Sequence, residues 1–138
     1  MAPNNPRIAD CTQAQGRSRL QQAEAFLMAA DLVLSDDTNT ASPGVAAALA
    51  VLAGIAASDA ACCVNLRKRP RGQDHAEAVK LLRTVVPHGE EMAKDLGRLV
   101  AAKDESHYGV TLVDRTKARR LVGYAKRLTE RARSVVTG

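Results

Sequence analysis

The feature that most constrains the fold is the alanine-rich segment 43–68. Between Val45 and Leu66 its plainly polar residues are Ser58, Asp59 and Asn65. Alanine and leucine favour helices, and a helix that is apolar on nearly every side needs neighbours on several faces. We therefore expect this segment to be the central helix of a bundle. Its uninterrupted apolar run, 45–57, is too short to cross a bilayer.

The rest of the chain also predicts an all-α fold. Aromatic residues make up 2% of the 138 residues, whereas strands favour aromatic and β-branched side chains. Apolar residues recur every three or four positions, which is the spacing of a helix face packed on a core. We expect a disordered N-terminal tail, 1–17, and a single domain, 18–138, that is an up-and-down bundle of four long helices and one short helix. The helices are expected at about 18–34, 43–68, 74–86, 90–108 and 114–136.

The cysteines and the first residues bear on where the protein works. Cys11, Cys62 and Cys63 are odd in number and two of them are adjacent, which is not a disulfide framework. Residues 1–10 contain no apolar signal core. We therefore expect a cytoplasmic protein in which Cys62 and Cys63 are buried thiols. Adjacent helical residues point about 100° apart and do not easily share an ion, so we expect no metal site. The sequence contains no P-loop and no dinucleotide-binding fingerprint, and we expect no cofactor.

Positive charge is concentrated late in the chain. The net charge is +5, and residues 114–138 carry eight Lys and Arg against Asp114 and Glu130. Such a run usually marks a solvated face, but this imbalance also suits RNA or an acidic partner protein. Arg115 and Arg119 are the candidate RNA contacts in this region. The scarcity of aromatic residues argues against a platform that reads single-stranded sequence.

The best candidate for chemistry lies at the end of the predicted fourth helix. Met92, Leu96 and Leu99 form an apolar stripe whose next core-facing position is Lys103, and His107 follows on the same face. A cation and an imidazole there are costly unless they are paired or face a cleft, and such placements are enriched at functional sites. The alternative is a solvated helix end, with Lys103 extending past the edge of the core.

A second candidate is the turn that precedes the predicted third helix, with Arg71, Asp74 and His75. Asp74 and Glu77 have the spacing of a capping box, which gives Asp74 a structural role as N-cap. A histidine beside a basic turn and a helix N-terminus also suits a phosphate.

Asp59 is a carboxylate on the central helix, and we expect it to be a structural polar residue that needs a partner. The sequence does not choose among the candidate partners, which are Lys103, His75, Arg83 and Tyr124.

The order of these features resembles the HEPN family, the higher eukaryotes and prokaryotes nucleotide-binding domain, and especially its small actinobacterial-type members. The resemblance covers about residues 18–136. It rests on the central helix VAAALAVLAGIAASDAA, the segment GQDHAEAVKLLR and the helix end LVAAKDESHYGV. It implies an up-and-down bundle that forms a homodimer. It also implies a metal-independent ribonuclease of toxin–antitoxin type, whose partner is a nucleotidyltransferase-like antitoxin.

The motif of the family's ribonucleases is an arginine, a polar residue and, after four to six intervening residues, a histidine. Lys103, Asp104 and His107 take these places here, with three residues between Lys103 and His107. His107 would then be the general acid or base and Lys103 the cation that stabilises phosphate charge. Other members lack the motif and bind nucleotides or proteins, and Tyr108 fits their pattern. Two hypotheses follow: a ribonuclease, and a non-catalytic nucleotide- or protein-binding module that acts as an interaction scaffold.

Overall fold

The computed structural model describes residues 7–72, 74–108 and 113–138, and for residues 104–108 it describes the backbone alone. Within these ranges there are five helices and a two-stranded antiparallel sheet. The helices are α1 (Gln13–Leu34), α2 (Ser42–Leu66), α3 (His75–Arg83), α4 (Gly89–Tyr108) and α5 (Arg115–Thr137), and the strands are β1 (Ile8–Asp10) and β2 (Lys68–Pro70). The predicted all-α fold is confirmed, with four long helices and one short one. The small sheet is a feature that the sequence did not predict.

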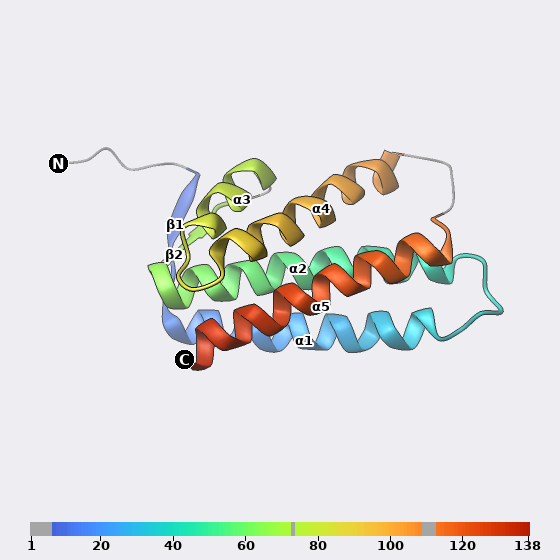
Figure 1. The fold of residues 1–138 in the computed structure, drawn as a ribbon, viewed down its shortest axis with the longest axis horizontal. Coiled ribbons are helices and arrows are strands. Elements are labelled where there is room, and N and C mark those ends of the chain that lie inside the picture. The colour runs from blue at the N-terminus through green and yellow to red at the C-terminus, as the bar shows by residue number, and fades with distance from the viewer. Residues whose placement is uncertain (1–6, 73, 109–112) are drawn as a thin grey trace.

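Helix α2 lies at the centre of the bundle (Figure 1). Helices α1 and α5 run beside it, and α4 crosses it from another side. Helix α3 packs on α4 at the end of the bundle where β1 and β2 lie. Although α2 has the length and apolar composition of a membrane-crossing helix, most of its apolar stretch is buried among these neighbours. The prediction of a buried central helix is therefore confirmed.

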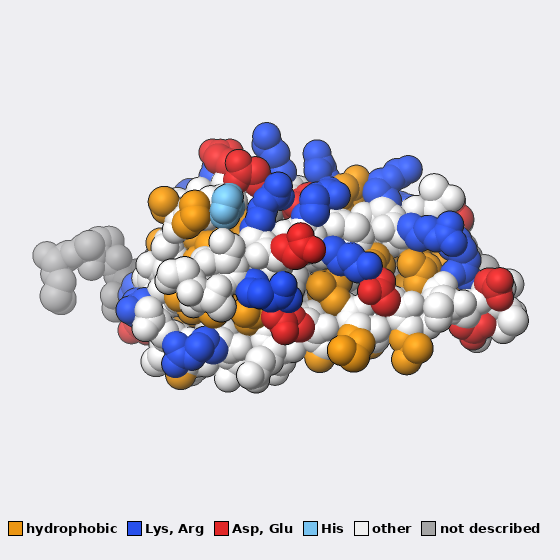
Figure 2. Space-filling model, turned by 60° about the horizontal axis from the view of Figure 1, so that its bottom comes forward, with side chains coloured by type: hydrophobic (Ala, Val, Ile, Leu, Met, Phe, Trp, Pro, Cys, Tyr) orange, Lys and Arg blue, Asp and Glu red, His pale blue; other side chains and the backbone are white. Residues whose placement is uncertain are grey.

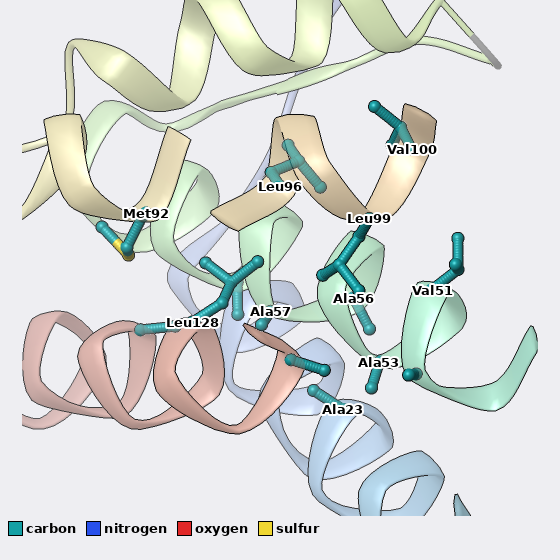
Figure 3. Close-up of a cluster of buried hydrophobic side chains, with 14 of the residues drawn as sticks. Ala23, Val51, Ala53, Ala56, Ala57, Met92, Leu96, Leu99, Val100 and Leu128 are labelled. Carbon is teal, nitrogen blue, oxygen red and sulfur yellow. The ribbon is translucent and has the colours of Figure 1, made fainter. Parts of the chain in front are cut away.

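Small side chains on α2 let the neighbouring helices approach closely (Figure 3). Leu99 of α4 packs directly over Gly54, where a Cβ atom would lie 2.4 Å from Leu99 Cδ1. The core cluster to which Leu99 belongs also includes Ala53, Ala56, Ala57, Met92, Leu96 and Leu128. Large leucines on α4 and α5 thus fill the space that the alanines on α2 leave open.

Helix α1 begins at Gln13, whereas the sequence predicted a start near Ser18. Thr12 is the N-cap: its Oγ1 accepts the Gln15 N–H at 3.1 Å, and the Gln15 side chain accepts the Thr12 N–H at 2.9 Å. This reciprocal pair is a capping box. Gly16 lets the first turn press on α2, since a Cβ there would lie 2.8 Å from Val64 Cγ2. Residues 7–17 are thus part of the fold, which differs from the predicted tail 1–17.

A disulfide bond joins Cys11, after β1, to Cys63 in α2, with the two Cα atoms 5.0 Å apart. The prediction that the cysteines do not pair is wrong for these two, while Cys62 is a buried thiol as expected. The prediction relied on the odd number of cysteines and on the adjacency of Cys62 and Cys63. It missed the bond because the partner of Cys63 is Cys11, 52 residues away in the sequence. Because two of the three cysteines are paired, the cysteines no longer support a cytoplasmic location. That location stays a prediction.

Candidate functional site

A pocket of about 390 Å³, here called the main pocket, opens between α1, α2, β2, α3 and α4. Its volume is in the range typical of small-molecule sites. The polar side chains that line it are Arg19, Ser58, Asp59, Arg69, Asp74, His75 and Lys103. The structure thus brings together four residues that the sequence singled out from three separate segments, namely Asp59, Asp74, His75 and Lys103.

Asp59 is held by Arg19 of α1. The Nε and Nη2 atoms of Arg19 donate to Asp59 Oδ2 at 3.1 and 2.8 Å. The side chain of Asp59 is 14% exposed. Burial raises the pKa of this carboxyl even though the Arg19 and Arg69 guanidiniums act to lower it. No hydrogen bond from the described residues reaches Asp59 Oδ1, so this oxygen is left to accept one from a ligand.

Arg19 was not among the four partners considered for Asp59. Arg83 lies 4.0 Å from Glu90, and the guanidiniums of Arg98 and Arg127 lie 5.1 and 5.2 Å from the centroid of the Tyr124 ring. His75 and Lys103 contact each other instead of forming an ion pair with Asp59, although both line the same pocket.

Lys103 and His75 meet across the main pocket from α4 and α3. The Lys103 Nζ atom lies 3.4 Å from His75 Nε2. His75 is the first residue of α3, where the turn after β2 brings the chain back toward α4. Lys103 therefore lines a cleft and does not only extend into solvent, while a functional role for it stays a prediction.

Asp74 has the structural role that the sequence predicted. Its Oδ1 accepts the Glu77 N–H at 3.0 Å, and Arg7 Nε lies 3.6 Å from its Oδ2. The carboxylate of Asp74 thus already occupies the positive N-terminus of α3. An anion in the main pocket would consequently be held by the basic side chains and not by the amides of this helix.

The pocket also has an apolar wall, with a buried serine beside it. Leu52, Ile55, Pro70, Ala78, Leu96 and Val100 form an apolar wall. Beside it, the Ser58 side chain is buried, and its Oγ atom makes no hydrogen bond within the described chain beyond a weak interaction with the Cys62 thiol. A pocket with one apolar wall and several basic groups suits a ligand that is itself divided into an apolar and an anionic part.

Arg71, Arg115 and Arg119, which the sequence also proposed for binding, do not line the main pocket. Arg71 is exposed, and its backbone N–H donates to the Arg7 carbonyl at 2.7 Å. Arg115 donates to the carbonyls of Leu34 and Asp36, so it braces the start of α5 against the end of α1. Arg119 is exposed on α5. His107 and Tyr108 belong to the last turn of α4, and their side chains lie outside the described residues.

Much of the basic run on α5 is neutralised within the protein. Asp95 of α4 has a side chain that is 3% exposed, and Arg98, Arg127 and Arg131 each approach its carboxylate to 3.3–3.4 Å. Lys126 pairs with Asp31 and Arg133 with Glu24 on α1. Lys and Arg side chains accordingly alternate with Asp and Glu on the face shown in Figure 2. These pairs leave less positive charge for RNA than the sequence count indicates.

Sequence reasoning missed three polar residues that matter here. Arg19 and Arg69 of the main pocket were each one of several similar cations, and no spacing rule separated them from their neighbours. Asp95 did carry a signal, because it lies three residues after Met92 and four before Leu99, on the buried face of α4.

Comparison of the chain with protein-family models, with curated proteins and with solved structures found no match.

Proposed function

We propose that the main pocket binds a nucleotide, with the phosphate held by Lys103, His75 and Arg69. The observation that carries the proposal is the convergence of these three side chains on one pocket with an apolar wall. Phosphate oxygens accept hydrogen bonds from Lys, Arg and imidazole N–H groups, and such charge-assisted bonds are the strong ones.

The charge in the main pocket favours an anionic ligand. Arg19 is paired with Asp59 and Arg7 with Asp74. Within the described part of the chain, Arg69 and Lys103 form no ion pair with a carboxylate. Among the described side chains, two cations without a direct ion pair and an imidazole therefore line the pocket, and Arg69 also attracts the Asp59 carboxylate. The apolar wall strengthens the electrostatic attraction of these groups for an anionic ligand.

The other parts of a nucleotide match the other parts of the pocket. A base is flat and largely apolar on its faces, and the wall formed by Leu52, Ile55 and Val100 offers packing for it. A ribose hydroxyl is a hydrogen-bond donor, and Asp59 Oδ1 is an acceptor without a partner among the described residues. These complementary groups favour a nucleotide over inorganic phosphate.

Calorimetric titration with AMP, adenosine and phosphate tests the proposal. We expect AMP to bind more tightly than either fragment, and Lys103→Gln or Arg69→Gln to weaken AMP binding by about ten-fold or more, since each removes a charge-assisted bond. Arg17→Gln is the control, because Arg17 is an exposed cation of α1 that does not line the pocket. Equal affinity for AMP and adenosine, or equal losses in all three variants, would contradict the proposal.

A metal-independent ribonuclease is the second candidate, favoured by the 3.4 Å contact between Lys103 Nζ and His75 Nε2. An imidazole to take a proton from a ribose 2′-hydroxyl and a cation to stabilise the phosphate are the groups that this cleavage requires. His75 would supply the imidazole in addition to, or in place of, His107. Cleavage of mixed RNA in EDTA that is lost in His75→Ala or His107→Ala would support this candidate, and absence of cleavage by the wild-type protein would reject it.

The family resemblance adds further proposals. From the resemblance we propose that the protein belongs to the HEPN family, forms a homodimer and has a nucleotidyltransferase-like antitoxin as its partner. The five-helix architecture is compatible with membership of that family. A cytoplasmic location, expected from the lack of an apolar signal core in residues 1–10, is a separate proposal. Light scattering of the purified protein tests the dimer directly.

A further inference from the structure

The Cys11–Cys63 bond lies where β1, β2 and α2 meet, next to the main pocket. Beside it, the Cys11 N–H donates to the Arg67 carbonyl at 2.9 Å, and further along the Arg71 N–H donates to the Arg7 carbonyl at 2.7 Å. Between these contacts Ala9 lies opposite Arg69 in the antiparallel register. Strand β1 therefore holds β2 along its whole length.

The sheet is too small to be stable without help. Each strand has three residues, and isolated two-stranded ribbons are marginal in water. The ion pairs that join the two segments, Lys68–Asp10 and Arg7–Asp74, involve exposed or half-exposed side chains. Pairs of this kind contribute little to stability. The disulfide ties the end of β1 to α2, shortly before β2 begins, and is consequently the covalent bond that keeps β1 beside β2.

Strand β2 supplies Arg69 and Pro70 to the main pocket. On the other side of Arg69 lies a shallow side groove, which is lined by Cys11, Ala14, Gln15, Ser18, Arg19, Gln22, Asp59 and Arg69. Arg19, Asp59 and Arg69 thus belong to both hollows. The wall that carries the phosphate-binding cation Arg69 is the one that the disulfide fastens.

We propose that the oxidation state of Cys11 and Cys63 controls the main pocket: the disulfide fixes Arg69 in the wall, and its reduction releases β2 and weakens ligand binding. The effect on the ligand rests on the proposed nucleotide function. The reductant is a dithiol. One of its thiolates attacks a sulfur of the Cys11–Cys63 bond, which breaks that bond and expels the other cysteine as a thiolate. The second thiolate of the reductant then attacks the reductant's own sulfur in the mixed disulfide and expels the remaining cysteine, so the reductant becomes a disulfide and the protein, after taking up two protons, holds two thiols. The side groove is the route, because Cys11 is 5% exposed there and Cys63 is fully buried.

Cys62 does not interfere with this exchange. Burial, and then the nearby Asp59 carboxylate, raise the pKa of its thiol to about 12. Because the thiolate is the attacking species in disulfide exchange, the protonated Cys62 does not displace its neighbour Cys63 from the bond. Cys62→Ser therefore serves as the matched control for substitutions of the other two cysteines.

The test compares oxidised protein, protein held in excess dithiothreitol, the double variant C11S/C63S and the control C62S. We expect AMP to bind about five-fold or more weakly to the reduced protein and to the double variant, the range of ordinary coupling between sites. The oxidised C62S protein should bind as wild type. Backbone amides of Arg69 and Arg71 should exchange with solvent faster after reduction, while the helical circular-dichroism signal stays unchanged. By reciprocity, AMP should shift the thiol–disulfide equilibrium toward the oxidised protein by the same factor.

Equal affinity and equal amide exchange in the two redox states would overturn the inference. Loss of the helical signal on reduction would overturn it as well, because the bond would then hold the whole fold and not the wall alone. If the oxidised protein does not bind AMP, the proposed function fails, and amide exchange at Arg69 and Arg71 decides whether the disulfide controls the wall. Arg69→Gln in the oxidised protein should reproduce the loss of affinity without any change in exchange at Arg71.

Discussion

Arg19 and Asp59 form an ion pair in the wall of the main pocket, with Arg19 Nη2 2.8 Å from Asp59 Oδ2. The pair links α1 to α2 across 40 positions of sequence. Burial nevertheless outweighs the attraction of Arg19, since the pKa of the Asp59 carboxyl is raised. Burying this carboxylate in the pocket wall does not stabilise the fold, and ionisable groups of this kind are enriched at functional sites. For this reason we assign Asp59 a role in ligand binding.

The free energy of unfolding should depend on pH through Asp59. Its folded pKa is higher than the ordinary value of 3.8, so the unfolded chain loses this proton first as pH rises. Stability should therefore fall between pH 3.8 and the folded pKa and stay lower above it. Asp59→Asn removes this loss of stability. We therefore expect the variant to be at least as stable as wild type at pH 7. Below the ordinary pKa of 3.8, where wild-type Asp59 is protonated, the variant should not be more stable than wild type. Urea unfolding across this pH range measures the difference.

Asp31→Asn is the control for this experiment, because Asp31 is a half-exposed carboxylate that pairs with Lys126, and its replacement should change stability by less than about 1 kcal/mol. A large loss of stability in Asp59→Asn at pH 7 would show that the bond to Arg19 outweighs the cost of burial.

The buried carboxylate of Asp95 should matter more for stability than any of its three arginines. Asp95→Ala removes the acceptor for all three guanidiniums at once, and we expect a loss of about 2 kcal/mol, the scale of a hydrogen bond to a charged group. Arg127→Ala leaves Arg98 and Arg131 in place, so it should cost less than about 1 kcal/mol. Thermal unfolding measures both. Equal losses would mean that Arg127 alone carries the interaction.

The fold could be predicted from the sequence because its signals are local. The apolar pattern of α2 requires neighbours on several faces. Asp74 and Asp114 cap α3 and α5 where the sequence places the helix starts. The start of α1 was missed because the threonine and glutamine of its capping box lie in a segment that is polar overall. Polar composition indicated a tail, whereas Gly16 in this segment packs tightly on α2.

The site could be predicted only in part, because it depends on contacts between distant segments. Lys103 interrupts an apolar stripe, and that irregularity correctly pointed to a cleft. The choice of Arg19 as the partner of Asp59 follows from the register of α1 on α2, which no local pattern encodes. The Cys11–Cys63 bond likewise requires β1 to lie beside the end of α2. Helix periodicity carries no information about either relationship.

Two glycines of α4 should respond in opposite ways to alanine. A Cβ atom at Gly89 would lie 2.5 Å from the Arg83 carbonyl oxygen and 2.9 Å from that of Leu82, so the end of α3 must move to accept it. We expect Gly89→Ala to cost about 1–3 kcal/mol, as overpacking usually does. A Cβ at Gly97 meets nothing within 4 Å, and Gly97→Ala should stabilise the helix by up to about 1 kcal/mol. Urea unfolding of the two variants compares them, and the same sign of change in both would contradict the packing at Gly89.

Arg115 and Arg119 were both candidate RNA contacts, but the structure gives them different surroundings. Arg115 donates to the Leu34 carbonyl and, at 2.9 Å, to the Asp36 carbonyl, which fastens the loop after α1 to the start of α5. Arg115→Gln should therefore lower the free energy of unfolding by about 1–2 kcal/mol, because it weakens two bonds from a charged donor. Arg119→Gln, on an exposed side chain, should change stability by less than about 0.5 kcal/mol.

The same two variants distinguish a structural role of Arg115 from a role in RNA binding. If Arg115 serves the fold alone, Arg115→Gln lowers the melting temperature and leaves the affinity for a short oligoribonucleotide equal to that of Arg119→Gln when both are measured well below their melting temperatures. If Arg115→Gln instead binds the oligoribonucleotide more weakly and melts at the same temperature as wild type, Arg115 is an RNA contact, as the sequence proposed. Fluorescence anisotropy at two salt concentrations measures this affinity, since a true phosphate contact also reduces the salt dependence of binding.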